Sequence, residues 1–213
     1  MNNNPTSKEK QFWDWFATNN AKYFFLNQID SDEERQLYLD EFLERLHEYD
    51  KHLFFEVGGY PDDVQDLIIT AEGELEYFDK VKKLVLSAPY IKNWRISALK
   101  PALKDGFIIY YEGIELNPKY LWFFPLENKK NPLLLGLRIY PENDELLQDK
   151  SKFVKAAYLV IDSLLGERSS ALIHHIEVAK LTEDPESQGL LELYDLPKYI
   201  QWKERTSSRI PFR

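Results

Sequence analysis

Apolar residues recur at helical spacing in four segments of the chain. The clearest is residues 32–49, where apolar positions repeat at i, i+3, i+4, i+7 and i+10 behind the capping-box sequence SDEE. The aromatic opening KEKQFWDWFATNN predicts a short helix that ends near Asn19 and Asn20. The same period marks residues 74–87 and about 146–165. The pattern therefore predicts four helices.

Runs rich in β-branched and aromatic residues lie between the helical segments. Two of them, 52–59 and 64–73, flank glycine, proline and aspartate residues and predict a hairpin. Further strands are predicted at 93–100, 106–113, 119–127, 131–141 and 171–181. Two β-helix-β units follow from this order, one built from 66–71, 74–87 and 94–99 and the other from 133–140, 146–165 and 171–180.

This order of elements predicts an α+β fold with a mainly antiparallel sheet and helices packed on one face. The two β-helix-β units favour an elaborated ferredoxin-like plan. We expect a single domain over 1–213, with N-terminal helices in 1–50, a sheet core with two helices in 51–181 and a C-terminal wrapping segment in 182–213. The last segment loses clear periodicity but is too apolar for a purely solvated tail.

The composition indicates a protein with a substantial core, because 44% of its residues are hydrophobic and 15% are aromatic. The lack of cysteine excludes disulfides, thiolate metal sites and a cysteine nucleophile. No run approaches the ~18 apolar residues of a membrane span, and MNNNPTSKEK lacks the apolar region of a secretory signal. We therefore expect a soluble, cytoplasmic protein with no membrane partner.

The formal net charge of −9 argues against nucleic acid as a partner, because phosphate contacts need an excess of Lys and Arg. The charge is unevenly distributed: residues 198–213 contain five basic residues and one acidic residue, or +4, which leaves −13 for the remainder. An acidic body with a short basic tail favours a basic protein partner, or a tail that folds back on its own body. Solubility alone is a simpler explanation.

The histidines are candidate metal ligands or general bases. His174 and His175 are adjacent on a predicted strand, so their side chains point to opposite faces and cannot bind one ion together without a bulge. His47 and His52 lie near a predicted helix end and strand start, with no carboxylate at a recognised ligand spacing. The sequence therefore predicts no metal site.

The acidic residues Glu72, Glu74 and Glu76 lie at a strand-to-helix turn of the kind that often carries function. Acids in a first helical turn also stabilise the helix dipole and its unpaired N–H groups, and we favour this interpretation. The motifs G-x-S-x-G, S-x-x-K with its partners and G-x-G-x-x-G are missing. The sequence therefore predicts no catalytic residue and no cofactor.

Aromatic residues supply the candidate interaction surface. The stretch SAPYIKNW, residues 87–94, is predicted to be a structural connection between a helix and a strand, because its proline ends the helix. The alternative is that its tyrosine, asparagine and tryptophan line a recognition surface. Alternation along the strands at 106–113 and 119–127 places some aromatics on the sheet face away from the helices, where an exposed patch would mark an interface. The predicted interaction surface comprises Tyr90, Asn93, Trp94, Tyr111, Trp122 and Phe124.

Three stretches, FWDWFATN, IITAEGELEYFDKVKKLV and APYIKNW, carry a resemblance to a known family. Together they resemble an uncharacterised family of bacterial proteins known as a domain of unknown function. The similarity covers roughly the first half of the chain. It implies a compact bacterial α+β protein and assigns no role to any residue.

The leading hypothesis is a non-enzymatic protein that binds another protein through an acidic and aromatic surface. The partner is a basic protein or a second copy of the chain, and an immunity-like inhibitor is one form of this function. The alternatives are a hydrolase that uses carboxylates and one histidine, such as Glu72, Glu74 and His175, and a small-ligand carrier with an apolar pocket between sheet and helices.

Overall fold

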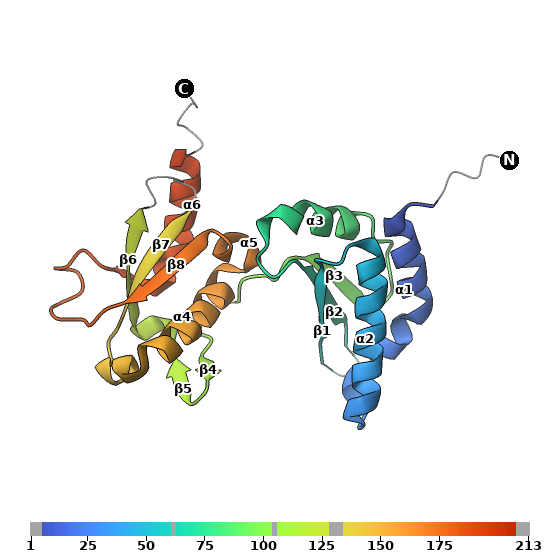
Figure 1. The fold of residues 1–213 in the computed structure, drawn as a ribbon, viewed down its shortest axis with the longest axis horizontal. Coiled ribbons are helices and arrows are strands. Elements are labelled where there is room, and N and C mark those ends of the chain that lie inside the picture. Colours follow the sequence, from blue (N-terminus) through green and yellow to red (C-terminus); the bar gives the residue numbers. More distant parts are fainter. Residues whose placement is uncertain (1–5, 61–62, 104–105, 128–133, 208–213) are drawn as a thin grey trace. The chain divides into compact units, whose positions relative to one another are not determined.

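The computed structural model describes residues 6–60, 63–103, 106–127 and 134–207. Contacts divide the chain into two compact units, Met1–Lys100 and Pro101–Arg213, here called the N-terminal and C-terminal units. Both contain helices and sheets, which confirms the α+β class (Figure 1). The predicted internal boundaries at residues 50 and 181 do not coincide with this division, and the single domain stays a prediction.

In the N-terminal unit, the described residues form a three-stranded sheet and three helices. The strands β1 (Phe54–Gly58), β2 (Gln65–Thr70) and β3 (Trp94–Ala98) form a sheet in the order β1-β2-β3. The helices are α1 (Lys8–Phe24), α2 (Asp32–Tyr49) and α3 (Phe78–Leu86), with 3-10 turns at Leu26–Gln28 and Leu75–Tyr77. β1 and β2 pair antiparallel, and β2 and β3 pair parallel across α3. The hairpin, the helix over 32–49 and the first β-helix-β unit are confirmed.

The first helix is longer than the sequence predicts, because α1 continues past Asn19 and Asn20 to Phe24. The two amides bond backward along the helix: Asn19 Nδ2 donates to the carbonyl of Trp15 at 2.8 Å, and Asn20 Nδ2 donates to that of Ala17 at 2.7 Å. Side chains that bond to earlier carbonyls do not terminate a helix. The predicted end near Asn19 and Asn20 is therefore wrong.

Aromatic rings from α1 and α2 cover one face of the β1-β2-β3 sheet. Phe42 of α2 stacks on Phe55 of β1 with ring centroids 4.0 Å apart. Phe16 of α1 meets the ring of Trp94 of β3 at 5.1 Å, edge to face. Phe16, Phe42 and Trp94 are all buried, and burial of each such side chain contributes roughly 1.5–3 kcal/mol. The aromatic opening of the sequence thus belongs to the core of this unit.

Trp13 is buried and connects two helices of the N-terminal unit, because its Nε1–H donates to the carbonyl of Leu84 in α3 at 2.8 Å. Trp13→Phe removes this hydrogen bond and part of the buried ring. We therefore expect the free energy of unfolding to fall by about 1–3 kcal/mol in urea denaturation followed by circular dichroism. Trp202→Phe is the control, since Trp202 is 57% exposed and its replacement should cost less than about 0.5 kcal/mol. Equal effects would contradict the core position of Trp13.

The described residues of the C-terminal unit form two sheets and three helices. Its strands are β4 (Ile109–Tyr111), β5 (Ile114–Leu116), β6 (Leu121–Glu127), β7 (Leu135–Pro141), β8 (Ile173–Val178) and β9 (Leu191–Glu192). Its helices are α4 (Lys150–Leu165), α5 (Glu167–Ser170) and α6 (Leu196–Ser207), with 3-10 turns at Pro118–Tyr120, Asp144–Asp149 and Leu193–Asp195. β4 pairs with β5, and the other strands form a sheet in the order β8-β7-β6-β9. β7 and β8 are parallel and joined through α4, which confirms the second β-helix-β unit.

The two β-helix-β units lie in different sheets, whereas a ferredoxin-like plan places them in one, so that plan is not confirmed. The predicted strand 106–113 stops at Tyr111, because Glu112 and Gly113 have φ values of 45° and 81°, as in a two-residue type I′ hairpin turn. β5 follows this turn and pairs back on β4, so the segment forms a hairpin of its own.

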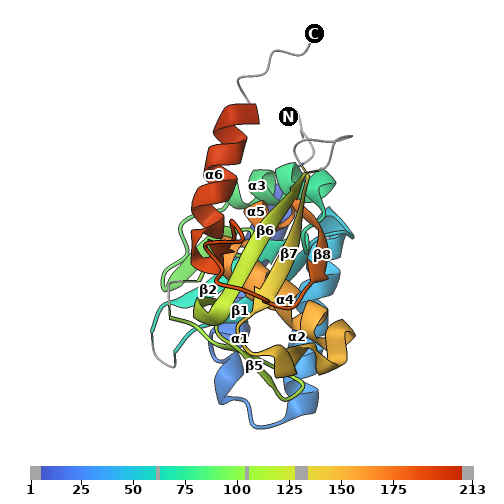
Figure 2. The ribbon, with the colours of Figure 1, turned by 90° about the vertical axis from the view of Figure 1, so that its left-hand side faces the viewer.

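Helix α4 forms the centre of the C-terminal core. It packs on one face of the four-stranded sheet and lies behind β6, β7 and β8 in Figure 2. The buried sheet residues in this core are Leu121, Phe123, Leu135, Leu137, Ile139, Ile173 and Ile176. The β4–β5 hairpin adds Leu116 to the same core. Among the described helices, none combines the length and the apolar character that crossing a membrane requires.

The segment after residue 182 contains a helix that the sequence analysis missed. α6 occupies Leu196–Ser207 and buries Leu196 and Ile200, while Leu193 is buried in the turn before it. Tyr199 of the same helix meets the ring of Phe123 at 5.9 Å. Leu196, Tyr199 and Ile200 recur at i, i+3 and i+4, which is helical spacing. The helix lies within the segment that the sequence predicts to wrap the body, and this wrapping role stays a prediction.

Each unit encloses its own hydrophobic core, so we expect fragments 1–100 and 101–213 to fold separately. Circular dichroism should show a cooperative thermal transition for each fragment, and each should give dispersed amide signals in two-dimensional NMR spectra. A fragment that remains unfolded while the full chain folds would contradict the division at residue 100.

Candidate functional site

One face of the four-stranded sheet in the C-terminal unit points away from α4 and carries aromatic side chains. Along β6, Leu121 and Phe123 are buried in the core, so Trp122 and Phe124 point to the other face. Trp122 is half-buried and Phe124 is 40% exposed. The structure thus places both residues where alternation along the strand predicts them. That they bind a partner stays a prediction.

The face that includes Trp122 and Phe124 is here called the open face, and it continues across the neighbouring strands. Trp122 pairs with Tyr140 of β7, and Phe124 pairs with Arg138. Arg138 is in turn paired with Glu177 of β8, and its Nε–H donates to Glu177 Oε1 at 2.7 Å. The open face therefore combines aromatic surface with one neutralised ion pair. Figure 2 shows the strands of this sheet in front of α4.

The segment that connects the two edge strands of this sheet is acidic. Because β8 and β9 are the opposite edge strands, residues 179–190 pass from one edge to the other. Glu183, Asp184 and Glu186 in this segment are exposed, and none forms a salt bridge with a basic residue among those described. Lys180, in contrast, is paired with Asp144. The surroundings of the open face thus include uncompensated negative charge.

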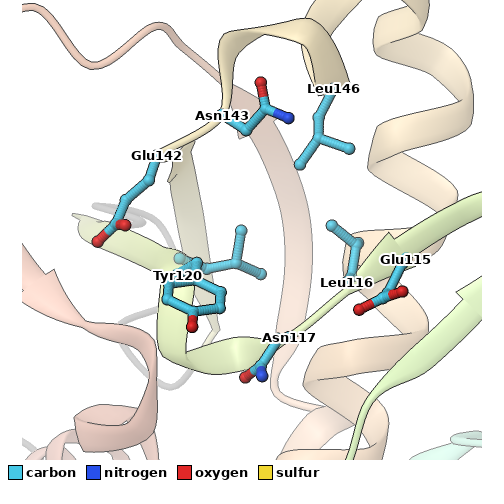
Figure 3. Close-up of a pocket in the computed structure, with 8 residues that line it drawn as sticks. Glu115, Leu116, Asn117, Tyr120, Glu142, Asn143 and Leu146 are labelled. Carbon is cyan, nitrogen blue, oxygen red and sulfur yellow. The ribbon is translucent and has the colours of Figure 1, made fainter.

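A pocket of about 350 Å³ adjoins the start of β6 and the end of β7 (Figure 3). Its lining residues are Glu115, Leu116, Asn117, Tyr120, Leu121, Glu142, Asn143 and Leu146. Leu116 and Leu146 point toward each other across the hollow, while Glu115, Asn117 and Tyr120 lie along its rim. The pocket therefore has an apolar interior and a polar rim that contains two carboxylates.

The amides of the pocket are held by the turns that they cap. Asn117 Oδ1 accepts from the backbone N–H of Lys119 at 2.9 Å, and Asn143 Oδ1 accepts from that of Glu145 at 3.0 Å. These bonds fix the orientation of both amides, so that each Nδ2 group remains as a donor. Trp122 Nε1–H donates to Glu142 Oε1 at 3.1 Å and thereby connects the pocket to the open face.

The N-terminal unit contains a polar cluster that joins the end of α2 to α3. Asp50 caps α2 and is bonded to Lys80 Nζ of α3. Its Oδ1 also accepts from the backbone N–H of His52 at 3.0 Å and lies 2.9 Å from His52 Nδ1. The His52 ring stacks on Tyr77 with centroids 4.1 Å apart. Metal-ligand spacings in the sequence do not reveal this role of His52, because its partner is a helix-capping aspartate two residues away.

The Asp50 carboxylate is 10% exposed, so its charge needs the partners around it. Burial alone would raise the pKa of Asp50, but hydrogen bonds from Lys80 and from the backbone and ring of His52 outweigh burial and lower this pKa to about 2. The carboxylate therefore stabilises the fold at pH values above its unfolded pKa of about 3.9, and this stabilisation disappears as the pH falls toward 2.

We expect Asp50→Asn to lower the free energy of unfolding by about 1–2 kcal/mol at pH 7. The difference from the wild-type protein should shrink as the pH falls from about 5 to 2, as measured by urea denaturation at each pH. Asp79→Asn is the control, because Asp79 is in an exposed i,i+3 ion pair with Lys82 and should have little effect at any pH. A constant difference across this pH range would contradict the assigned role of Asp50.

The two adjacent histidines lie at an irregularity of β8. The register shifts between Leu135 and Gly136, so that Leu135 pairs with Ile173 whereas Gly136 pairs with His175. His174 is the extra residue, and its Nδ1–H donates to the carbonyl of Leu135 at 2.9 Å. The centroids of the two imidazole rings are 6.4 Å apart. In the described part of the chain, no group of three or more His, Asp or Glu side chains is arranged to hold a metal ion.

Two residues of the predicted interaction surface are wrongly placed there. Trp94 is only 8% exposed, because its ring packs on Phe16 and its Nε1–H donates to Asn20 Oδ1 at 3.2 Å. Tyr111 packs onto the C-terminal core from β4, so it does not share a face with Trp122. The sequence showed that these rings are aromatic but not which elements would cover them.

The stretch 87–94 connects the end of α3 to the start of β3. Asn93 adopts a positive φ of 64° in the turn before β3, and its carbonyl accepts from the backbone N–H of Gln65 at 3.0 Å. Tyr90 is 90% exposed. Glu72 also has a positive φ, of 51°, and lies with Glu74 in the exposed turn between β2 and α3. A binding role for Tyr90 and Asn93 stays a prediction.

The pocket was missed by the sequence analysis. Asn117 precedes Pro118 and Asn143 precedes Asp144, and such pairs are turn signals that mark both caps. Nothing in the sequence shows that these two turns meet, because β6 and β7 must pair first.

Comparison with known proteins finds no protein family, no curated protein and no solved structure that matches the chain. The resemblance of the first half to a bacterial family therefore stays a prediction.

Proposed function

We propose that the protein binds a basic protein partner through the open face of its C-terminal unit. The observation that carries this proposal is the exposure of Phe124 beside Trp122 on a sheet face turned away from α4. Exposed aromatic side chains grouped on one surface are typical of protein interfaces. The rings offer a large contact area with little loss of conformational entropy on binding.

The charge around the open face favours a basic partner over a second copy of the chain. Glu183, Asp184 and Glu186 lack basic partners among the described residues, and two copies would bring these acids toward one another. A basic partner would instead gain faster association and a correctly oriented approach. An inhibitor of a basic protein, as in immunity proteins, is one form of this function.

A hydrolase is less well supported. Its candidate residues Glu72 and Glu74 belong to the N-terminal unit and His175 to the C-terminal unit, so neither unit by itself contains the full set. The donors and acceptors of the pocket instead favour binding of a polar group, which is compatible with recognition of a protein.

We expect Phe124→Ala to abolish retention of the partner in a pull-down by the tagged protein from a lysate of its own host. The exposed ring contributes to binding and not to the core, so thermal melting of the variant should match that of the wild-type protein. Leu159→Ala is the matched control, because Leu159 is also 40% exposed but lies on α4. Mass spectrometry should identify a basic protein that the wild type and Leu159→Ala retain and that Phe124→Ala loses.

High salt should release the same protein, because screening weakens attraction between opposite charges. Equal retention by Phe124→Ala and Leu159→Ala, or no specific retention by the wild-type protein, would overturn the proposal.

A further inference from the structure

The pocket beside the open face has features that suit a cation with an aliphatic stem. Its interior is formed by leucines, and Glu115 supplies negative charge at its rim, while the Glu142 side chain extends away from the hollow and accepts from Trp122 (Figure 3). No lysine, arginine or histidine is among its lining residues. The side chains of Lys and Arg bury an apolar stem while the charged head remains at a polar surface. The chemistry of the pocket is therefore complementary to such a side chain.

We infer that this pocket receives one arginine side chain of the proposed basic partner, and the inference rests on the proposed function. The methylene groups of the arginine lie against Leu146, and its guanidinium donates to the carboxylate of Glu115. A planar guanidinium can form two parallel bonds with one carboxylate, which a lysine ammonium cannot do. The volume of about 350 Å³ is large enough to admit one arginine side chain.

Tyr120 provides a second attraction for the guanidinium. Its side chain lies at the rim of the pocket, and Lys119 Nζ already lies 5.7 Å from the centroid of its ring. A tyrosine ring attracts cations through its quadrupole, and a guanidinium also stacks on it. The position of Lys119 shows that the Tyr120 ring is accessible to a cation. The positive charge of Lys119 at the same time opposes binding of a second cation.

The amides explain why the ligand is an arginine within a peptide chain. Asn117 and Asn143 keep their Nδ2 donors because their Oδ1 atoms cap turns. A guanidinium has no acceptor for these donors, but the backbone carbonyls beside an arginine residue do. The pocket therefore matches both the side chain and the peptide groups of a bound arginine residue.

The Trp122 indole gives a direct measurement of binding to the full-length protein. Its Nε1–H donates to Glu142 at the rim, so a cation in the pocket should shift this NMR signal. The probe is N-acetyl-arginine amide, and N-acetyl-citrulline amide is the neutral control of nearly equal shape. We expect a saturable shift with the arginine probe and at least about tenfold weaker binding of the citrulline probe. The spectrum of Trp122→Phe assigns the signal.

Three variants test the roles of individual residues. Glu115→Gln should weaken binding of the arginine probe about tenfold, because it removes the charge that the guanidinium meets. Lys119→Met should strengthen binding about two- to fivefold, because it removes a competing cation. Leu159→Ala should leave probe binding unchanged, since Leu159 lies on α4 and does not line the pocket. Equal binding of the two probes, or no effect of Glu115→Gln, would overturn the inference.

These results separate the inference from the proposed function. If Phe124→Ala loses the partner but the wild-type pocket does not bind the arginine probe, the inference fails and the proposed function stands. If the pocket binds the arginine probe but the lysate contains no partner that depends on Phe124, the proposed function fails and, with it, the assignment of the arginine to that partner.

Discussion

The packing of α4 against one face of the four-stranded sheet is the contact on which the C-terminal unit depends. Leu121 and Phe123 are committed to this core, so the residues that alternate with them, Trp122 and Phe124, must point away from it. A shift of one residue in the register of β6 would reverse this arrangement and expose the core side chains. The aromatic open face therefore follows directly from the way in which the core is built.

The pocket depends on the same strands, because it forms where β6 begins and β7 ends. The backbone N–H of Glu142 donates to the carbonyl of Tyr120 at 3.1 Å, which holds the two turns together. Trp122 then connects Glu142 to the open face. A basic partner could thus contact aromatic surface and a charged rim in one binding event, and ion pairs beside a desolvated aromatic patch favour specific recognition.

The net charge of the chain is not shared equally by the two units. Residues 1–100 contain 19 acidic and 12 basic side chains, or −7, whereas residues 101–213 contain 17 acidic and 15 basic side chains, or −2. Most of the basic residues described in the N-terminal unit form salt bridges with acidic residues. One example is Lys80, which pairs with Asp50 at the end of α2. The proposed binding of a basic partner therefore depends on acids such as Glu183 and Glu186, and not on the charge of the whole chain.

The sequence alone determined the α+β class, the helix over 32–49, the hairpin at 52–73 and both β-helix-β units, because these depend on local periodicity and capping. It also determined the face on which Trp122 and Phe124 lie, because side chains alternate along a strand. The tertiary structure decided the burial of Trp94, the folding of 106–116 into a hairpin, the formation of α6 and the assembly of the pocket. The burial of Trp94 and the assembly of the pocket depend on contacts between distant segments: Phe16 covers Trp94, and the turns at Tyr120 and Glu142 meet only when β6 and β7 pair. Local patterns carry no information about such contacts, so the physical reason lies in the packing of the core.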